Sequence, residues 1–241
     1  MRTRDYGSRA RIGVAVPFSN PTVEPELRAL LPADIGVYAT RLVHPADRVE
    51  ERLHHYMHHM PDAIATFGVM RLAAFGFGCT GSSYLATVAT EDRLASEATA
   101  ATGIPVVTAA QAIRRALTLF GARRIALVSP YPVSLAEAGY RYWEAAGFSV
   151  TARLRVDQDL ADTHDIYELT SDEALAAIRT VDRSGADCLV VSGTGMPTLR
   201  ALRAVVTELP VPVISSNLCL AWALLAAADP DNAPERPAQL L

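Results

Sequence analysis

The sequence predicts an α/β protein with two pseudo-symmetric lobes, each a four-stranded parallel sheet flanked by helices, and an active site in the cleft between them. Short apolar runs alternate with helical stretches along the chain, as is typical of buried parallel strands. The pattern also repeats, because three segments recur roughly 110 residues later, a spacing that indicates two lobes rather than a solenoid. The matching pairs are 12–17 with 125–130, 78–81 with 192–195, and 104–107 with 211–214.

The first half supplies four strand-like runs. After the run RIGVAVP at 11–17, a helix is expected to start with Asn20 as its N-cap and Pro21 in its first turn. The helical stretch at 47–68 is expected to break near Pro61, because proline removes a backbone donor. We expect strands at 11–17, 35–43, 72–77 and 104–108. We expect helices at 47–68 and 91–102, and a further helix that follows the 104–108 strand and ends at residue 120.

The second half repeats this order. Ser171 is the expected cap of a helix, and residues 157–170 before it are polar and irregular. We expect strands at 123–129, 149–156, 188–192 and 211–214, and helices at 135–146, 171–184, 197–209 and 218–228. The first lobe should therefore comprise residues 1–112 and the second 113–215, with a last helix at 216–228 near the first lobe and a loose tail at 229–241.

Composition excludes several classes of function. The formal charge of the 241-residue chain is −4 and no basic run occurs, so nucleic acid is not an expected partner. No apolar stretch approaches the ~20 residues of a membrane span, and no signal peptide is evident, so we expect a cytoplasmic protein without membrane contact. All 22 basic residues are arginine, which excludes a lysine Schiff base. Three cysteines indicate no disulfide framework.

Cys79 is the main catalytic candidate. It follows the apolar run at 72–77 and precedes a helical pattern, so it lies among unpaired backbone N–H groups near the positive end of a helix dipole. Such a setting favours a thiolate and binds an anion. Thr80, Gly81 and Ser82 at the same turn are candidates for holding a carboxylate or an enolate.

The other candidate residues lie in loops after matching strands. Tyr131, between two prolines, is a catalytic candidate because its hydroxyl needs a partner. Asn20 is as well suited to bind a ligand as to cap a helix, and Asn217 is a helix cap or a weaker ligand candidate. Further substrate-binding candidates are the counterparts of the Cys79 turn, namely Gly193, Thr194 and Gly195.

Three other features indicate structure rather than chemistry. Cys188, at the start of a strand, and Cys219, in an apolar helix, are interpreted as core residues. Four histidines at 54, 55, 58 and 59 have the i, i+4 spacing of metal ligands, but we interpret them as a surface face and expect no metal site. The G-x-G-x-x-G pattern at 76–81 follows the third strand instead of the first, so a dinucleotide site is not expected.

Four motifs together resemble a known family. They are VPFSNPTVEPE at 16–26, GCT at 78–80, SPY at 129–131 and PVISSN at 212–217. They resemble the maleate isomerase and arylmalonate decarboxylase branch of the aspartate/glutamate racemase superfamily, over about residues 11–228. The resemblance implies catalysis in the cleft without metal or cofactor, a small carboxylate substrate and a homo-oligomer.

The chain departs from this family in one respect. Typical members carry one cysteine in each mirror loop, whereas here Cys79 stands opposite Gly193. Two-base racemisation needs an acid or base on each face of the substrate, so it is not the expected reaction. In arylmalonate decarboxylases the single cysteine lies in the second lobe. In maleate isomerases the first-lobe cysteine resembles a nucleophile that adds to the double bond. This chain retains that cysteine as Cys79.

The resemblance implies a maleate-like cis–trans isomerase as the first hypothesis. The alternatives are a decarboxylase of substituted malonates or a one-base racemase or isomerase acting α to a carboxylate, and a non-catalytic carboxylate-binding relative. The proton that a second cysteine would handle has three candidate sources, which are Tyr131, His164 and water.

Overall fold

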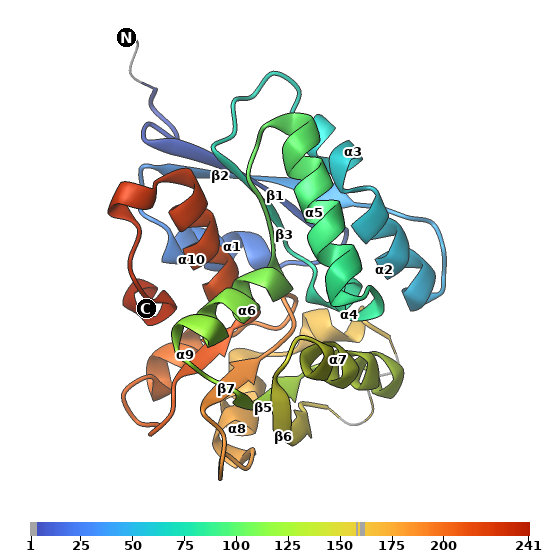
Figure 1. Cartoon of the computed structure of the whole chain (residues 1–241), viewed down its shortest axis with the longest axis vertical. Coiled ribbons are helices and arrows are strands. Elements are labelled where there is room, and N and C mark those ends of the chain that lie inside the picture. The colour runs from blue at the N-terminus through green and yellow to red at the C-terminus, as the bar shows by residue number, and fades with distance from the viewer. Residues whose placement is uncertain (1–3, 158, 160–161) are drawn as a thin grey trace.

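Two parallel four-stranded sheets form the upper and lower halves of the molecule in Figure 1. The computed structural model describes residues 4–157, 159 and 162–241, so residues 158, 160 and 161 of the irregular segment lie outside it. The strand orders, β2-β1-β3-β4 and β6-β5-β7-β8, are the same, which confirms the predicted fold and its duplication. The strands are β1 Ala10–Pro17, β2 Ile35–Leu42, β3 Ala74–Phe77, β4 Val106–Thr108, β5 Arg124–Ser129, β6 Ser149–Arg155, β7 Cys188–Val191 and β8 Val213–Ser215.

The strand register brings the functional loops together. β1 is central in its sheet, and Ala15 pairs with Phe77 of β3, so the carboxyl ends of these two strands lie side by side. The Gly78 amide donates to the Ala15 carbonyl at 2.8 Å, and in the second sheet the Ser192 amide donates to the Val128 carbonyl at the same distance. The two mirror loops therefore leave their sheets in the same way.

Helices cover both sheets, and the apolar faces of most of them are buried. Helices α4 and α7 meet between the two halves of the molecule (Figure 1). The helices are α1 Val23–Leu30, α2 Val49–His58, α3 Met60–Ala65, α4 Thr80–Leu85, α5 Val88–Thr102, α6 Ala109–Leu119, α7 Val133–Ala145, α8 Ser171–Thr180, α9 Leu199–Val205 and α10 Ser216–Ala228, with 3₁₀ turns η1 Asp165–Glu168, η2 Pro230–Asn232 and η3 Pro237–Leu240.

Three helix caps differ from the sequence expectation. The N-cap of α1 is Thr22, although the side chain of Asn20 still accepts hydrogen bonds from the first turn. Thr170 caps α8 through a reciprocal capping box, one residue before the expected Ser171. Ser215 caps α10, so Asn217 is free of that role. In each case a hydroxyl or amide near the expected position was available, and local backbone geometry decided between them.

The end of the chain packs against the first sheet's side of the molecule. α10 contacts α6, α1 and β3, and is buried almost all round (Figure 1). The tail expected to be loose instead lies on α10, where the Trp222 indole donates to the Pro234 carbonyl at 2.8 Å and Pro237 is buried. The expected lobe boundary at residue 112 falls inside α6, so the exact division into lobes stays a prediction.

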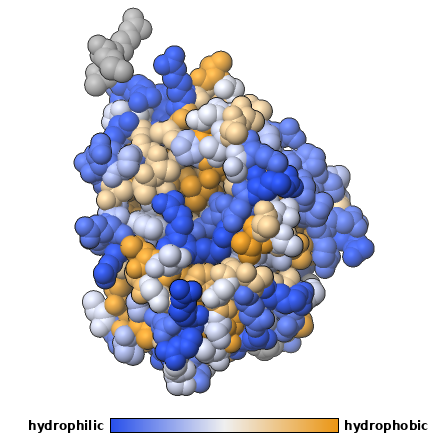
Figure 2. Space-filling view, viewed as in Figure 1, coloured by the Kyte–Doolittle hydropathy of each residue, from blue (hydrophilic) through white to orange (hydrophobic). Residues whose placement is uncertain are grey.

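The surface mixes polar and apolar residues. On the face shown in Figure 2, hydrophobic patches are interrupted by strongly hydrophilic residues. Within the described part of the chain, no helix is both long enough and apolar enough to span a bilayer.

Candidate active site

Cys79 lies where β3 passes into α4, as the N-cap residue of that helix. Its side chain is buried, and the Ser82 hydroxyl donates to Sγ at 3.2 Å. Burial raises the pKa of the Cys79 thiol, and hydrogen bonds from the Ser82 side chain and from the Ser82 and Gly81 backbone oppose that rise without cancelling it. Burial therefore opposes the thiolate that the helix terminus favours, and the net effect on the pKa of Cys79 is upward.

Tyr131 lies in the loop after β5, the counterpart of the loop after β1 that carries Asn20, and it is as buried as Cys79. Burial, with nearby Tyr84 and Cys79, raises the pKa of its phenol well above the usual value, while hydrogen bonds with Thr80 and Ser192 act in the opposite direction. Its hydroxyl therefore keeps its proton at neutral pH. Cys79 and Tyr131 both line one pocket, as the sequence predicted from their loops.

Gly193 is the second-lobe counterpart of Cys79, and the structure leaves it no room for a side chain. Its φ of +99° is unfavourable for L-residues. A Cβ atom there would lie 2.7 and 2.8 Å from Cγ and Cδ of Pro130, and 3.7 Å from the Tyr131 hydroxyl oxygen. The Tyr131 hydroxyl thus stands beside the place from which a second thiol would reach into the cleft.

Asn20 both accepts hydrogen bonds from the start of α1 and faces the pocket. Its Oδ1 accepts from the backbone amides of Thr22 at 2.9 Å and Val23 at 3.2 Å. Its Nδ2 donates across the cleft to Thr194 Oγ1 at 3.4 Å, and Thr194 in turn donates to the Gly78 carbonyl at 2.8 Å. The two loops after β3 and β7 are therefore joined directly.

The remaining sequence candidates fall into two groups. Thr80, Gly81 and Gly195 line the pocket with Cys79. Asn217 lies behind this wall, where its Nδ2 donates to Glu26 at 2.8 Å and to the Thr194 carbonyl at 3.1 Å. The position of Asn217 therefore does not favour direct contact with a ligand. Ser82 and Gly193 also lie outside the set of residues that line the pocket.

Of the outer wall of the pocket, the sequence analysis named only His164, as a candidate proton source. This wall comes from one face of α2, from Leu135 of α7 and from the segment around η1. The cavity measures about 500 Å³, including space open to solvent. An apolar i, i+3, i+4 pattern at 53, 56 and 57 indicates the buried face of α2. The four neighbouring histidines led to an interpretation of this stretch as a surface face instead. The outer wall comprises Arg52, Leu53, Tyr56, Leu135, Thr163, His164, Ile166 and Tyr167.

Arg52 is the buried cation of this wall. Its guanidinium donates to both carboxylate oxygens of Asp162, at 3.0 and 3.2 Å, and to the carbonyls of Ala46 and Asp47. Burial opposes ionisation of Asp162, but hydrogen bonds from the His164 amide and from Arg52 outweigh it and lower the pKa of that carboxyl. This pair joins α2 of the first lobe to the η1 segment of the second.

Aromatic hydroxyls complete the setting of the thiol. Burial and the proximity of Cys79 raise the pKa of Tyr56 to about 12, although Arg52 acts in the opposite direction. Burial and the proximity of Cys79 also raise the pKa of Tyr167. The pocket therefore offers neutral hydroxyl donors around a neutral thiol.

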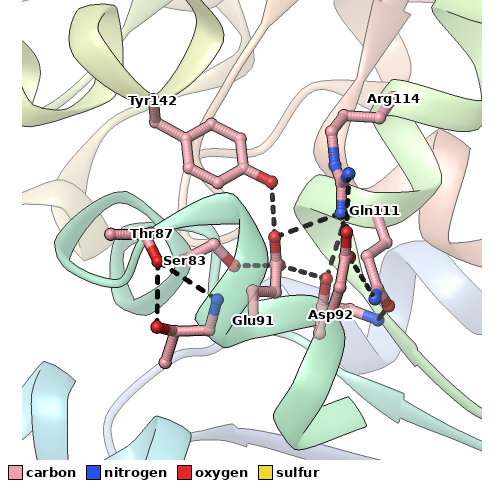
Figure 3. A network of polar contacts seen from close by, with 9 residues as sticks. Ser83, Thr87, Glu91, Asp92, Gln111, Arg114 and Tyr142 are labelled. Atoms are coloured by element: carbon pink, nitrogen blue, oxygen red, sulfur yellow. Dashed lines mark hydrogen bonds and ion pairs between the residues drawn. The ribbon is translucent and has the colours of Figure 1, made fainter. Parts of the chain in front are cut away.

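A buried carboxylate anchors α4 from behind (Figure 3). Glu91 is fully buried and accepts hydrogen bonds from the hydroxyls of Ser83, Thr108 and Tyr142, with Arg114 at 3.5 Å. Burial raises the pKa of Glu91, and the three hydroxyl donors partly offset this. Because Tyr142 comes from α7, the network connects the helix after Cys79 to the second lobe.

The other cysteines and the histidines occupy the places expected of structural residues. Cys188 and Cys219 are fully buried. The three histidines of α2 and His59, its C-cap residue, stack in i, i+4 pairs, with ring centroids 4.0 and 3.7 Å apart. Among the described residues, no group of three or more His, Cys, Asp or Glu side chains is arranged to hold a metal ion.

Comparison with known proteins places this geometry in context. A family model described as arylmalonate decarboxylase matches residues 12–241. A maleate isomerase from Nocardia farcinica is 29% identical over 243 residues, which cover 91% of this chain and 90% of the relative. A crystal structure of the Nocardia farcinica maleate cis–trans isomerase, a mutant with a covalently bound succinylcysteine intermediate, superposes with a TM-score of 0.81 at 28% identity, covering 96% of this chain and 98% of that chain. Arylmalonate decarboxylase itself has the same fold, with a TM-score of 0.67 at 24% identity and coverage of 90% of this chain and 92% of that chain.

Proposed function

Because the chain belongs to the arylmalonate decarboxylase family, we propose that it is a cofactor-independent isomerase that converts a small maleate-like dicarboxylate from cis to trans. The observation that carries the proposal is the asymmetric pair in the pocket. A thiol, Cys79, stands on the first lobe, and a phenol, Tyr131, stands beside the counterpart position on the second. An addition across a double bond uses one nucleophile and one proton donor.

The reaction balances with these two groups. The Cys79 sulfur forms a bond to one alkene carbon while Tyr131 gives its proton to the other, and the thiol proton passes to the Tyr131 oxygen. The former double bond is then single and rotates. Reversal of the proton transfers and cleavage of the carbon–sulfur bond release the trans isomer. The succinylcysteine in the Nocardia farcinica structure is a covalent species of this kind in that protein.

Neutral donors around the pocket suit a dianion that becomes enolate-like in the transition state. We assign the carboxylates to the side chains of Asn20, Thr80 and Thr194 and to the backbone at Gly81 and Gly195, which line the pocket. Ser82 and Asn217 hold this wall in place, through Cys79 and Thr194 respectively. Preorganised donors of this type are worth more in a water-poor site than in solution.

Proton NMR of the purified protein with maleate tests the proposal directly. Appearance of fumarate, lost in Cys79→Ser, is the expected result. Release of CO₂ from an arylmalonate without conversion of maleate would instead indicate a decarboxylase. Tight binding of a dicarboxylate with no turnover of either compound would indicate a binding protein.

The family also supports proposals about the oligomeric state and the cellular location of the protein. We propose that the chain acts as a homo-oligomer in the cytoplasm, with no nucleic-acid or membrane partner. Light scattering of the purified chain tests the assembly, and a monomeric mass would contradict it.

A further inference from the structure

A line of buried hydrogen bonds runs from the core of α7 to the pocket. The Trp143 indole N–H donates to the Tyr84 hydroxyl oxygen at 2.9 Å, and the Tyr84 and Ser192 hydroxyl oxygens are 2.6 Å apart. The Ser192 hydroxyl in turn lies near the Tyr131 hydroxyl and, like that of Thr80, acts to lower the pKa of Tyr131. Trp143, Tyr84 and Ser192 are all almost fully buried, and they come from three different elements.

The first member of this line fixes its direction. An indole N–H is only a donor, so the Tyr84 oxygen accepts from Trp143. The single proton of Tyr84 then has the Ser192 oxygen as its acceptor, and leaving it unpaired in the core would carry a desolvation cost. Since Ser192 accepts from Tyr84, its own proton is available for the Tyr131 oxygen. The bonds thus point from Trp143 outward to the pocket.

The geometry points to Tyr84 as a positioning residue for the reaction: together with Trp143 and Ser192, it stabilises the charge on the Tyr131 oxygen when the proton of that oxygen leaves. This inference rests on the proposed role of Tyr131 as proton donor. The proton moves from the Tyr131 oxygen to carbon, and the Cys79 thiol replaces it, so Tyr84 itself exchanges no atom with the substrate.

Packing around Tyr84 supports a positioning role. Its ring meets the Tyr131 ring edge-on, with centroids 5.7 Å apart and an interplanar angle of 80°. A Cβ atom at Gly139 of α7 would lie 2.7 Å from Cε2 of Tyr84. The absence of a side chain at Gly139 is therefore what lets Tyr84 lie close enough to α7 to reach Trp143.

Tyr84→Phe tests the inference, with Tyr142→Phe as its matched control. Both substitutions remove one hydroxyl from the same aromatic cluster, since the two rings are 5.4 Å apart, but the Tyr142 hydroxyl donates to Glu91 and lies outside the line. With maleate as substrate, we expect kcat of Tyr84→Phe to fall about tenfold, equivalent to about 1.4 kcal/mol, with KM unchanged. We expect Tyr142→Phe to keep the wild-type kcat even where it lowers the unfolding temperature.

Two outcomes would overturn the inference, and they are distinguishable from failure of the proposed function. If Tyr131→Phe loses activity while Tyr84→Phe keeps its kcat, or loses as much as Tyr142→Phe, then Tyr84 has only a structural role. If the wild-type protein leaves maleate unchanged, or Tyr131→Phe retains full activity, the proposed function fails and this inference fails with it.

Discussion

Gly193→Ala is the sharpest test of the asymmetry between the two lobes. A side chain at φ +99° carries a backbone strain of about 1–3 kcal/mol. The new Cβ would also overlap the Pro130 ring at 2.7 Å, and overpacking of this kind costs about 1–3 kcal/mol more. We therefore expect the free energy of unfolding to fall by about 2–6 kcal/mol. Because Pro130 precedes Tyr131, any shift that relieves the overlap also displaces the proposed proton donor, so kcat should fall as well.

Gly147→Ala supplies the matched control. Gly147 has a similar φ of +89°, but nothing lies within 4 Å of the Cβ position there. Its replacement carries the backbone strain alone, so the difference between the two variants isolates the contact with Pro130. Urea unfolding followed by circular dichroism measures both. Equal losses of stability in the two variants, with unchanged turnover of maleate in Gly193→Ala, would refute the argument that Pro130 excludes a side chain at position 193 of this chain.

Three further predictions follow from the site. Iodoacetamide should label Cys79 slowly at pH 7 and faster as the pH rises, because burial raises the pKa of its thiol. Peptide mass spectrometry measures the rate of labelling. Rapid labelling at pH 7 would instead mean that Cys79 is a thiolate. Asn20→Asp keeps the acceptor for the first turn of α1 but removes the donor to Thr194. Calorimetry should therefore show little loss of stability, while KM for maleate should rise about tenfold. An unchanged KM would exclude Asn20 from the binding site. Burial raises the pKa of Glu91 in the folded state, so its contribution to stability is full below the unfolded pKa of about 4.3 and is lost as the pH rises through the folded value. Glu91→Gln should flatten that decline in urea titrations at several pH values, and identical slopes in both proteins would contradict it.

Local sequence patterns were sufficient for the fold and for the inner part of the site. Strand-end loops at Cys79 and Tyr131 could be found because apolar runs end sharply before them and the duplication gives each loop a counterpart. Parallel pairing then places these loops on one side of the sheets, whatever the detailed packing. That geometry is why Asn20, Thr80 and Thr194 meet in one pocket as expected.

The outer wall and the state of the thiol depend on tertiary packing instead. Arg52 and Tyr167 reach the pocket only because α2 and η1 close over it, and no local spacing relates residues so far apart in the chain. The protonation of Cys79 is likewise decided by burial, which a strand–helix turn alone does not reveal. Asn217 lies in the loop that the sequence indicated, but its side-chain amide donates to Glu26 behind the pocket wall and does not line the pocket.

The chemical difference between the two central groups argues for addition over racemisation. A racemase exchanges a proton between two faces, so its two groups must be able to replace one another as acid and base. Here the first lobe carries a thiol and the second a phenol, so the two groups are not an interchangeable pair, and burial raises the pKa of both. Sulfur is the better nucleophile, and the phenol is fixed among hydroxyl groups that can stabilise its conjugate base. The pair is therefore suited to add S–H across a double bond and to remove it again, which is the chemistry of cis–trans isomerisation.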